Sequence, residues 1–159
     1  MISEEGFEDW YRETWPTAYR AIRAVTLNHS DSEEVLSEAF TRAFEKVAEL
    51  ANHPAPEAWV IVTAMNIFRD RFKKLNNVKR FLLVQNQSYE MQTNALSDDL
   101  EKALKELPTR QREVIALRVI LELSTEETAK YLEISAPTVS THLRRALESL
   151  RNKLNEDSQ

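Results

Sequence analysis

Residues 124–139 read STEETAKYLEISAPTV, and this stretch decides the fold of the C-terminal part of the chain. Ser124 and Glu127 form the S-x-x-E pattern of a helix capping box, in which each side chain accepts a hydrogen bond from the other residue's backbone N–H. Pro137 suits the first turn of a second helix, because the N–H that it lacks has no helical partner there. The stretch therefore predicts a short helix, a turn at Glu133–Ser135 and a second helix.

Three residues set the angle between these two helices. Ala129 is small enough to let the helices cross closely, Ile134 fills the gap at the turn, and Val139 packs back from the second helix. Glu133 occupies a turn position that often carries glycine, and a left-handed conformation there costs a non-glycine residue about 1 kcal/mol. The spacing predicts a helix-turn-helix, whose second helix enters the DNA major groove.

The N-terminal section, from about Phe7 to Leu75, is dense in apolar residues at helical spacing. Ser30 and Glu33 form a second capping-box pattern, which predicts the start of another helix. The prolines of Asn52–Pro56 end that helix. The apolar face of the first helix is expected to comprise Phe7, Tyr11, Trp15, Tyr19 and Ile22. The inner face of the second is expected to comprise Val35, Leu36, Ala39, Phe40, Ala43, Phe44 and Val47. A third helix from about residue 57 completes a bundle.

The segment between these sections is rich in amides and has no sustained period, which is typical of a linker. The chain has a single glycine, whereas tight hairpins need glycine. We therefore predict an all-α protein of two small helical domains, residues 1–75 and 99–159, joined by a linker at 76–98.

The composition of the chain excludes several classes of function. The net charge of −5 argues against nucleic acid unless a local basic face exists, so the distribution of charge matters more than its sum. No apolar stretch reaches the roughly 20 residues of a membrane span, and the acidic N-terminus is unlike a secretory signal, so we expect a cytoplasmic protein without membrane insertion. The three histidines are scattered and cysteine is absent. We expect no metal, no cofactor and no enzymatic activity.

The sequence resembles bacterial RNA polymerase sigma factors of the sigma-70 family, in their small extracytoplasmic-function form. The stretches Leu107–Val114, Leu123–Ala129 and Ile134–Val139 resemble the family's fourth conserved region. Asp31–Phe44 (DSEEVLSEAFTRAF) resembles its second region, as do Pro56–Trp59, Ala64–Asn66 and Asp70–Arg71. The resemblance implies a promoter-recognition subunit that binds core RNA polymerase and directs transcription initiation.

The resemblance also assigns a polymerase-docking surface. It implies that the second helix docks on the clamp helices of the largest polymerase subunit through Asp31, Glu33, Glu34 and Glu38. Carboxylates there offer acceptors to a partner's arginines. A solvated helix N-terminus explains the same acidic residues without any partner. The polymerase flap is expected as a second contact.

Two DNA surfaces are implied in the same way. The −10 element is expected to meet the third helix and the loop before it, through Asn52, His53, Asn66, Arg69, Arg71, Lys73 and Lys74. The −35 element is expected to meet the recognition helix through Ala136, Thr138, Ser140, Thr141, Arg144 and Arg145. The alternatives are an ordinary proline-bearing turn and simple solvent exposure. Ser140 and His142 depart from the cationic residues common in the family, which leaves the −35 sequence open.

Two questions remain open at this level. The apolar run Phe81–Val84 has three candidate partners: the polymerase, the other domain of the free protein, and an anti-sigma factor. The competing function is a helix-turn-helix regulator resembling a response-regulator output domain, acting without polymerase docking. It accounts for the residues after 100 and leaves the N-terminal pattern unexplained.

Overall fold

The computed structural model describes residues 2–82 and 96–157, and within these ranges all regular structure is helical, as predicted. The N-terminal domain contains α1 (Phe7–Thr26), α2 (His29–Glu45), the short α3 (Val47–Leu50) and the long α4 (Pro56–Leu82). The C-terminal domain contains α5 (Asp98–Lys105), α6 (Thr109–Ile115), the π-helical turn η1 (Ala116–Ile120), α7 (Thr125–Leu132) and α8 (Ala136–Asp157). No helix in the described ranges is both long and apolar enough to cross a bilayer.

The first domain is a bundle of α1, α2 and α4 around fully buried side chains that include Ile22, Leu36, Ile61 and Met65. The predicted aromatic face of α1 packs as expected, with the Tyr11 ring edge-on to Phe40 at a centroid distance of 4.8 Å. These contacts fix α2 and α4 side by side. The bundle thereby sets the exposed faces of both helices.

The start and inner face of α2 differ from the sequence prediction. Asn28, and not Ser30, caps the helix: its Oδ1 accepts a hydrogen bond from the N–H of Asp31 at 2.8 Å. The backbone of Asn28 is extended, as a cap requires, and Ser30 already lies inside the helix. Phe44 was expected on the inner face but is 47% exposed. It lies at the edge of the bundle, where it meets only the edge of the Phe7 ring among the aromatic contacts described.

The helix α4 continues through residues 76–82, which the sequence analysis placed in the linker. No proline or glycine interrupts this stretch, and amide residues at its beginning do not stop a helix that is already formed. The side chains of the apolar run Phe81–Val84 all lie outside the part of the chain whose side chains the structure describes.

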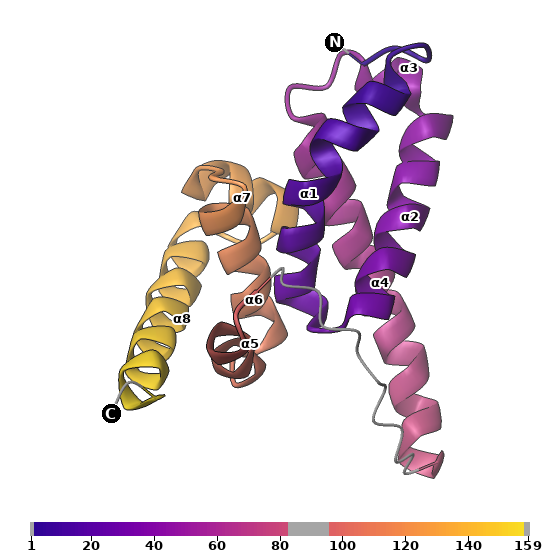
Figure 1. The fold of residues 1–159 in the computed structure, drawn as a ribbon. Helices are drawn as coiled ribbons and strands as arrows, with labels where there is room; N and C mark the ends of the chain where they lie inside the picture. The colour runs from indigo at the N-terminus through magenta and orange to yellow at the C-terminus, as the bar shows by residue number, and fades with distance from the viewer. Residues whose placement is uncertain (1, 83–95, 158–159) are drawn as a thin grey trace.

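The two domains pack directly against each other. In Figure 1, α5, α6 and α7 lie between α1 and α8, so that α8 forms the outer side of the C-terminal domain. One apolar cluster contains Ile22 and Ile61 of the first domain together with Val114 and Leu117 of the second. Ala24 of α1 belongs to a further cluster with Leu104 and other residues of the C-terminal domain. The interface is therefore continuous with both cores.

Candidate nucleic-acid interface

The helix-turn-helix forms as predicted. The hydroxyl of Ser124 accepts a hydrogen bond from the N–H of Glu127 at 3.0 Å, and the N–H of Ser124 donates to the Glu127 carboxylate at 3.1 Å. The bond from the Ser124 backbone N–H to the ionised carboxyl, together with the Ser124 side chain, lowers the pKa of Glu127. Glu133 ends α7 with φ of 57°, the left-handed conformation expected at the turn. Val139 is fully buried, so it fixes the position of the second helix.

The recognition helix α8 presents an open outward face. Ser140, Arg144 and Arg145 are exposed, whereas Ala136, Thr138 and Thr141 are half-buried. The hydroxyl of Ser135 lies 2.7 Å from that of Thr138 and accepts the Thr138 N–H at 3.2 Å, which caps the helix. Two arginine side chains therefore project from a rigid helix, with donors that match guanine or phosphate acceptors.

The residues predicted to contact the −10 element lie along α4 and the loop before it, but they are partly engaged inside the protein. His53 is half-buried, and its Nδ1 accepts a hydrogen bond from the N–H of Ala55 at 3.0 Å, which shapes the loop. Arg69 donates to Asn66 at 3.4 Å and forms an ion pair with Glu113 of α6. Asn52 and Lys74 are exposed. Lys73 lies on α4, but its side chain is outside the described part.

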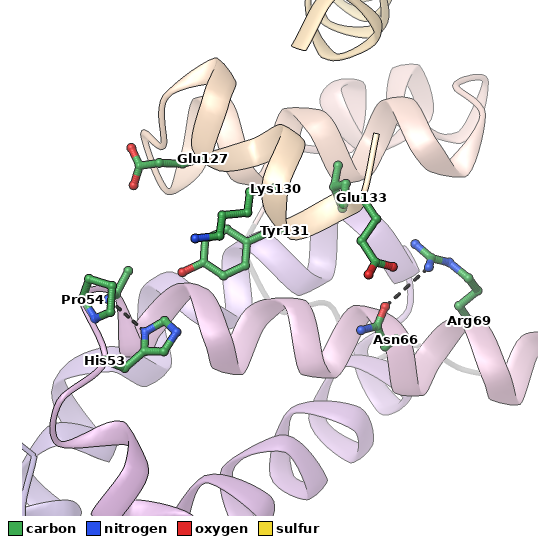
Figure 2. A pocket seen from close by; sticks show the side chains of 10 residues that line it. His53, Pro54, Asn66, Arg69, Glu127, Lys130, Tyr131 and Glu133 are labelled. Carbon is green, nitrogen blue, oxygen red and sulfur yellow. Dashed lines mark hydrogen bonds between the residues drawn. The ribbon is translucent and has the colours of Figure 1, made fainter. Parts of the chain in front are cut away.

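A cleft of about 520 Å³ opens where α4 and its preceding loop face α7. Figure 2 shows His53, Asn66 and Arg69 on one wall, with Lys130, Tyr131 and Glu133 on the other. The ring of Tyr131 lies 6.5 Å from that of His53, centroid to centroid. Burial and the carboxylates of Glu127 and Glu57 raise the pKa of Tyr131. The cleft lies between the two domains, and three of the predicted DNA-binding residues, His53, Asn66 and Arg69, line it.

Arg71 joins the two predicted binding surfaces of the first domain. Its Nη1 lies 2.7 Å from Glu34 Oε1, and it also forms an ion pair with Glu38. Glu38 pairs in addition with Arg42 at 2.8 Å. Two of the acidic residues of α2 therefore neutralise a basic residue of α4 across the bundle.

The other two acidic residues predicted to dock on the polymerase, Asp31 and Glu33, differ in exposure. Glu33 is exposed and lies 3.5 Å from the ring of His29, while Asp31 is half-buried at the first turn. Elsewhere on the bundle, α1 and α2 form a shallow groove of about 360 Å³ lined by Phe7, Tyr11, Ser37, Phe40, Thr41 and Phe44.

Sequence reasoning named His53 and Arg69 but missed the residues that contact them, and other residues, across the domain interface. Tyr131, Glu113, Arg23, Glu101 and Arg112 carry no motif for such contacts, because their partners lie tens of residues away in the chain. The buried carboxylate of Glu113 lies within a stretch that the sequence places in the helical part of the second domain. Only the folded arrangement reveals its partner.

Both domains of this chain match known protein families. A family model for Sigma-70 region 2 matches residues 10–78, and one for Sigma-70, region 4 matches residues 97–150. The RNA polymerase sigma-E factor of Streptomyces avermitilis is 30% identical over 154 residues, which cover 93% of this chain and 84% of that protein. The RNA polymerase sigma factor SigV of Bacillus subtilis is 26% identical, with 87% of this chain and 85% of that protein covered.

A solved structure has the same fold. It is that of the sigma factor RpoE of Bartonella quintana, in complex with the anti-sigma factor NepR. The TM-score is 0.82 at 21% identity, and the match covers 95% of this chain and 98% of that one.

Both conserved regions of the sigma-70 class of transcription factors are thus present, in order. The chain belongs to the sigma-70 family of RNA polymerase sigma factors, in its extracytoplasmic-function group. It is an RNA polymerase sigma factor that directs transcription initiation, and the alternative of a response-regulator-like regulator is not favoured.

Proposed function

We propose that the protein reads a two-part promoter with the surfaces described above. The exposed face of α8 reads the −35 element as duplex DNA, with Arg144 and Arg145 as its cationic contacts. The observation that supports this proposal is the exposed outward face of α8. The buried side chain of Val139 holds this helix in place. A recognition helix with this geometry enters the major groove through its exposed side chains.

In this proposal, α4 and the loop before it bind the −10 element. Arg69, Arg71, Lys73 and Lys74 hold phosphates, while Asn52, His53 and Asn66 hold a base that has left the stack. The exposure of Asn52, Asn66 and Lys74 supports this assignment. Base capture offsets the unstacking cost of a few kcal/mol per step and so favours the melted strand.

The acidic face of α2 docks on the polymerase. The carboxylates of Asp31, Glu33, Glu34 and Glu38 bind cationic side chains on the clamp helices of the largest subunit. Glu33 and Glu34 are exposed, which supports their availability to a partner. The C-terminal domain meets the flap. In this proposal the protein works in the cytoplasm and supplies binding energy, while the polymerase performs the chemistry.

A footprint of the polymerase–promoter complex tests the −35 assignment. Complexes are assembled with the unaltered protein, with Arg144→Ala, and with Arg151→Ala, an exposed arginine near the far end of the same helix. Arg144→Ala is expected to lose protection of the upstream element while Arg151→Ala keeps it. Equal protection by both variants contradicts the role of Arg144.

A further inference from the structure

The cleft between the two domains has the size and the position of a small-molecule site. Its volume of about 520 Å³ lies within the usual range of ligand pockets, which often form where two domains meet. α4 and the loop before it contribute one wall, and α7 contributes the other (Figure 2). The proposed function gives a role to residues of the first wall, but none to the α7 residues that face them.

Two aromatic rings line the end of the cleft near the loop. His53 and Tyr131 are both half-buried, with 6.5 Å between their ring centroids and a tilt of 36°. Figure 2 shows the side chain of Tyr131 reaching from α7 towards the loop that carries His53 and Pro54. A flat heterocycle that enters the cleft therefore meets one aromatic ring from each domain. Stacking on such rings accepts any nucleobase, because every base has a π-face.

The charged groups of the cleft favour a ligand with little negative charge. Lys130 is exposed and has no ion pair with any residue that the structure describes, so its ammonium group is available to a phosphate. Arg69 is already paired with Glu113. The carboxylates of Glu127 and Glu133 also line the cleft. Because these carboxylates repel an anion, the cleft suits a single phosphate better than a triphosphate.

Hydrogen-bonding groups line the other end of the cleft. Figure 2 shows the carboxylate of Glu133 pointing from α7 towards Asn66 and Arg69. The Oδ1 of Asn66 accepts a hydrogen bond from Arg69 at 3.4 Å, which leaves its Nδ2 as a donor for a ligand. A carboxylate accepts hydrogen bonds from ribose hydroxyls and from the amino group of a base. The cleft thus combines aromatic surface, a cation, a donor and an acceptor.

We propose that this cleft binds a free purine nucleotide with one phosphate. The base stacks against Tyr131 and His53, and the phosphate pairs with Lys130. Asn66 and Glu133 bind the polar groups of the nucleotide at the other end. A purine is the better of the two base classes, because its larger ring system stacks over more area. The inference goes beyond the proposed function, since it adds a small-molecule ligand held by residues of both domains.

Calorimetric titration of the full chain with adenosine monophosphate and, separately, guanosine monophosphate measures this binding. Adenosine lacks the phosphate, ribose 5-phosphate lacks the base, and adenosine triphosphate carries more charge, so these three are titrated for comparison. At least one monophosphate is expected to bind in a one-to-one complex, and more tightly than any of the three. Amide chemical shifts in NMR spectra locate the ligand, with changes expected at His53–Ala55 and Lys130–Glu133.

Substitutions on α7 test the two main contacts. Tyr131→Leu removes the stacking ring and should weaken nucleotide binding on the order of tenfold, whereas Tyr131→Phe keeps the ring and should bind like the unaltered protein. Lys130→Ala removes the phosphate contact and should weaken binding about fivefold. Lys105→Ala, at an exposed position on α5, is its matched control and should leave the affinity unchanged.

Short single-stranded DNA of mixed sequence is the other source of the same base and phosphate chemistry, so it is titrated in parallel. DNA binding that persists in Tyr131→Leu and Lys130→Ala, with no binding of either monophosphate, assigns the bases to the −10 surface and overturns the inference. The inference is also overturned if neither monophosphate binds at concentrations up to about 1 mM. Monophosphate binding that is equally tight in Tyr131→Leu, in Lys130→Ala and in their two controls overturns it as well.

Discussion

Arg71 and Glu34 form an ion pair at 2.7 Å, which joins a residue assigned to DNA with one assigned to the polymerase. The pair is largely solvent-accessible, with side chains 36% and 66% exposed, so it contributes little to stability. Its position matters more than its strength. A partner that binds Glu34 leaves Arg71 with one fewer intramolecular acceptor when the promoter arrives.

Reversal of the charge at Glu34 tests the docking surface. Glu34→Lys is expected to weaken binding to core polymerase at least tenfold, because a cation replaces an acceptor at the contact. The exposure of Glu34 predicts a change of less than about 1 kcal/mol in the free energy of unfolding. Binding is measured by fluorescence anisotropy of the labelled protein against core polymerase. Glu45→Lys, an exposed change at the end of the same helix, is the control, and equal affinity of both variants contradicts the assignment.

Removal of the α7 cap tests the helix-turn-helix. Ser124→Ala removes the hydroxyl that accepts the Glu127 N–H, and should lower the free energy of unfolding by about 1 kcal/mol. Urea unfolding followed by circular dichroism measures the change. Ser149→Ala, an exposed mid-helix change on α8, should have little effect. A loss of the same size in both variants refutes the importance of the cap.

The cap also gives a pH dependence. Because the folded-state pKa of Glu127 is lowered, its contribution to stability is complete above its unfolded pKa and is lost as the pH falls through the folded pKa. The stability difference between the unaltered protein and Ser124→Ala should therefore shrink in acid. A difference that stays constant from neutral to acidic pH is the contrary result.

The left-handed turn residue offers a stabilising change. Glu133 has φ of 57° and ψ of 41°, a conformation that glycine adopts without the steric cost of a Cβ atom. Glu133→Gly is expected to be more stable than Glu133→Ala by about 1 kcal/mol, with the carboxylate absent from both proteins. Thermal unfolding compares the two. Greater stability of the alanine variant contradicts strain at this turn.

The sequence predicted those features that depend on local pattern. Ser124 with Glu127 predicted the start of α7, and the spacing of Ala129 and Val139 predicted the crossing of α7 and α8, because capping and helix packing act over a few residues. Local pattern wrongly pointed to Ser30 as the α2 cap, where Asn28 caps the helix, since both residue types cap helices well. The choice depends on where the chain leaves α1.

The long-range contacts of the candidate site could not be predicted from the sequence. The pair of Arg69 and Glu113 spans 44 residues in the chain, and no periodicity connects its members. Glu113 looks like an ordinary surface carboxylate in a helix, yet it is buried at a domain interface. Such contacts follow from how two finished domains dock, and a single sequence holds no local signal for that.

The central claim is most directly tested by run-off transcription with purified core RNA polymerase on a genomic fragment library, with and without this protein. The account predicts transcripts only in its presence, starting downstream of a shared two-part sequence motif. It also predicts that Arg144→Ala lowers their yield and that Arg151→Ala does not. Core polymerase that gains no promoter-specific initiation from the protein contradicts the account.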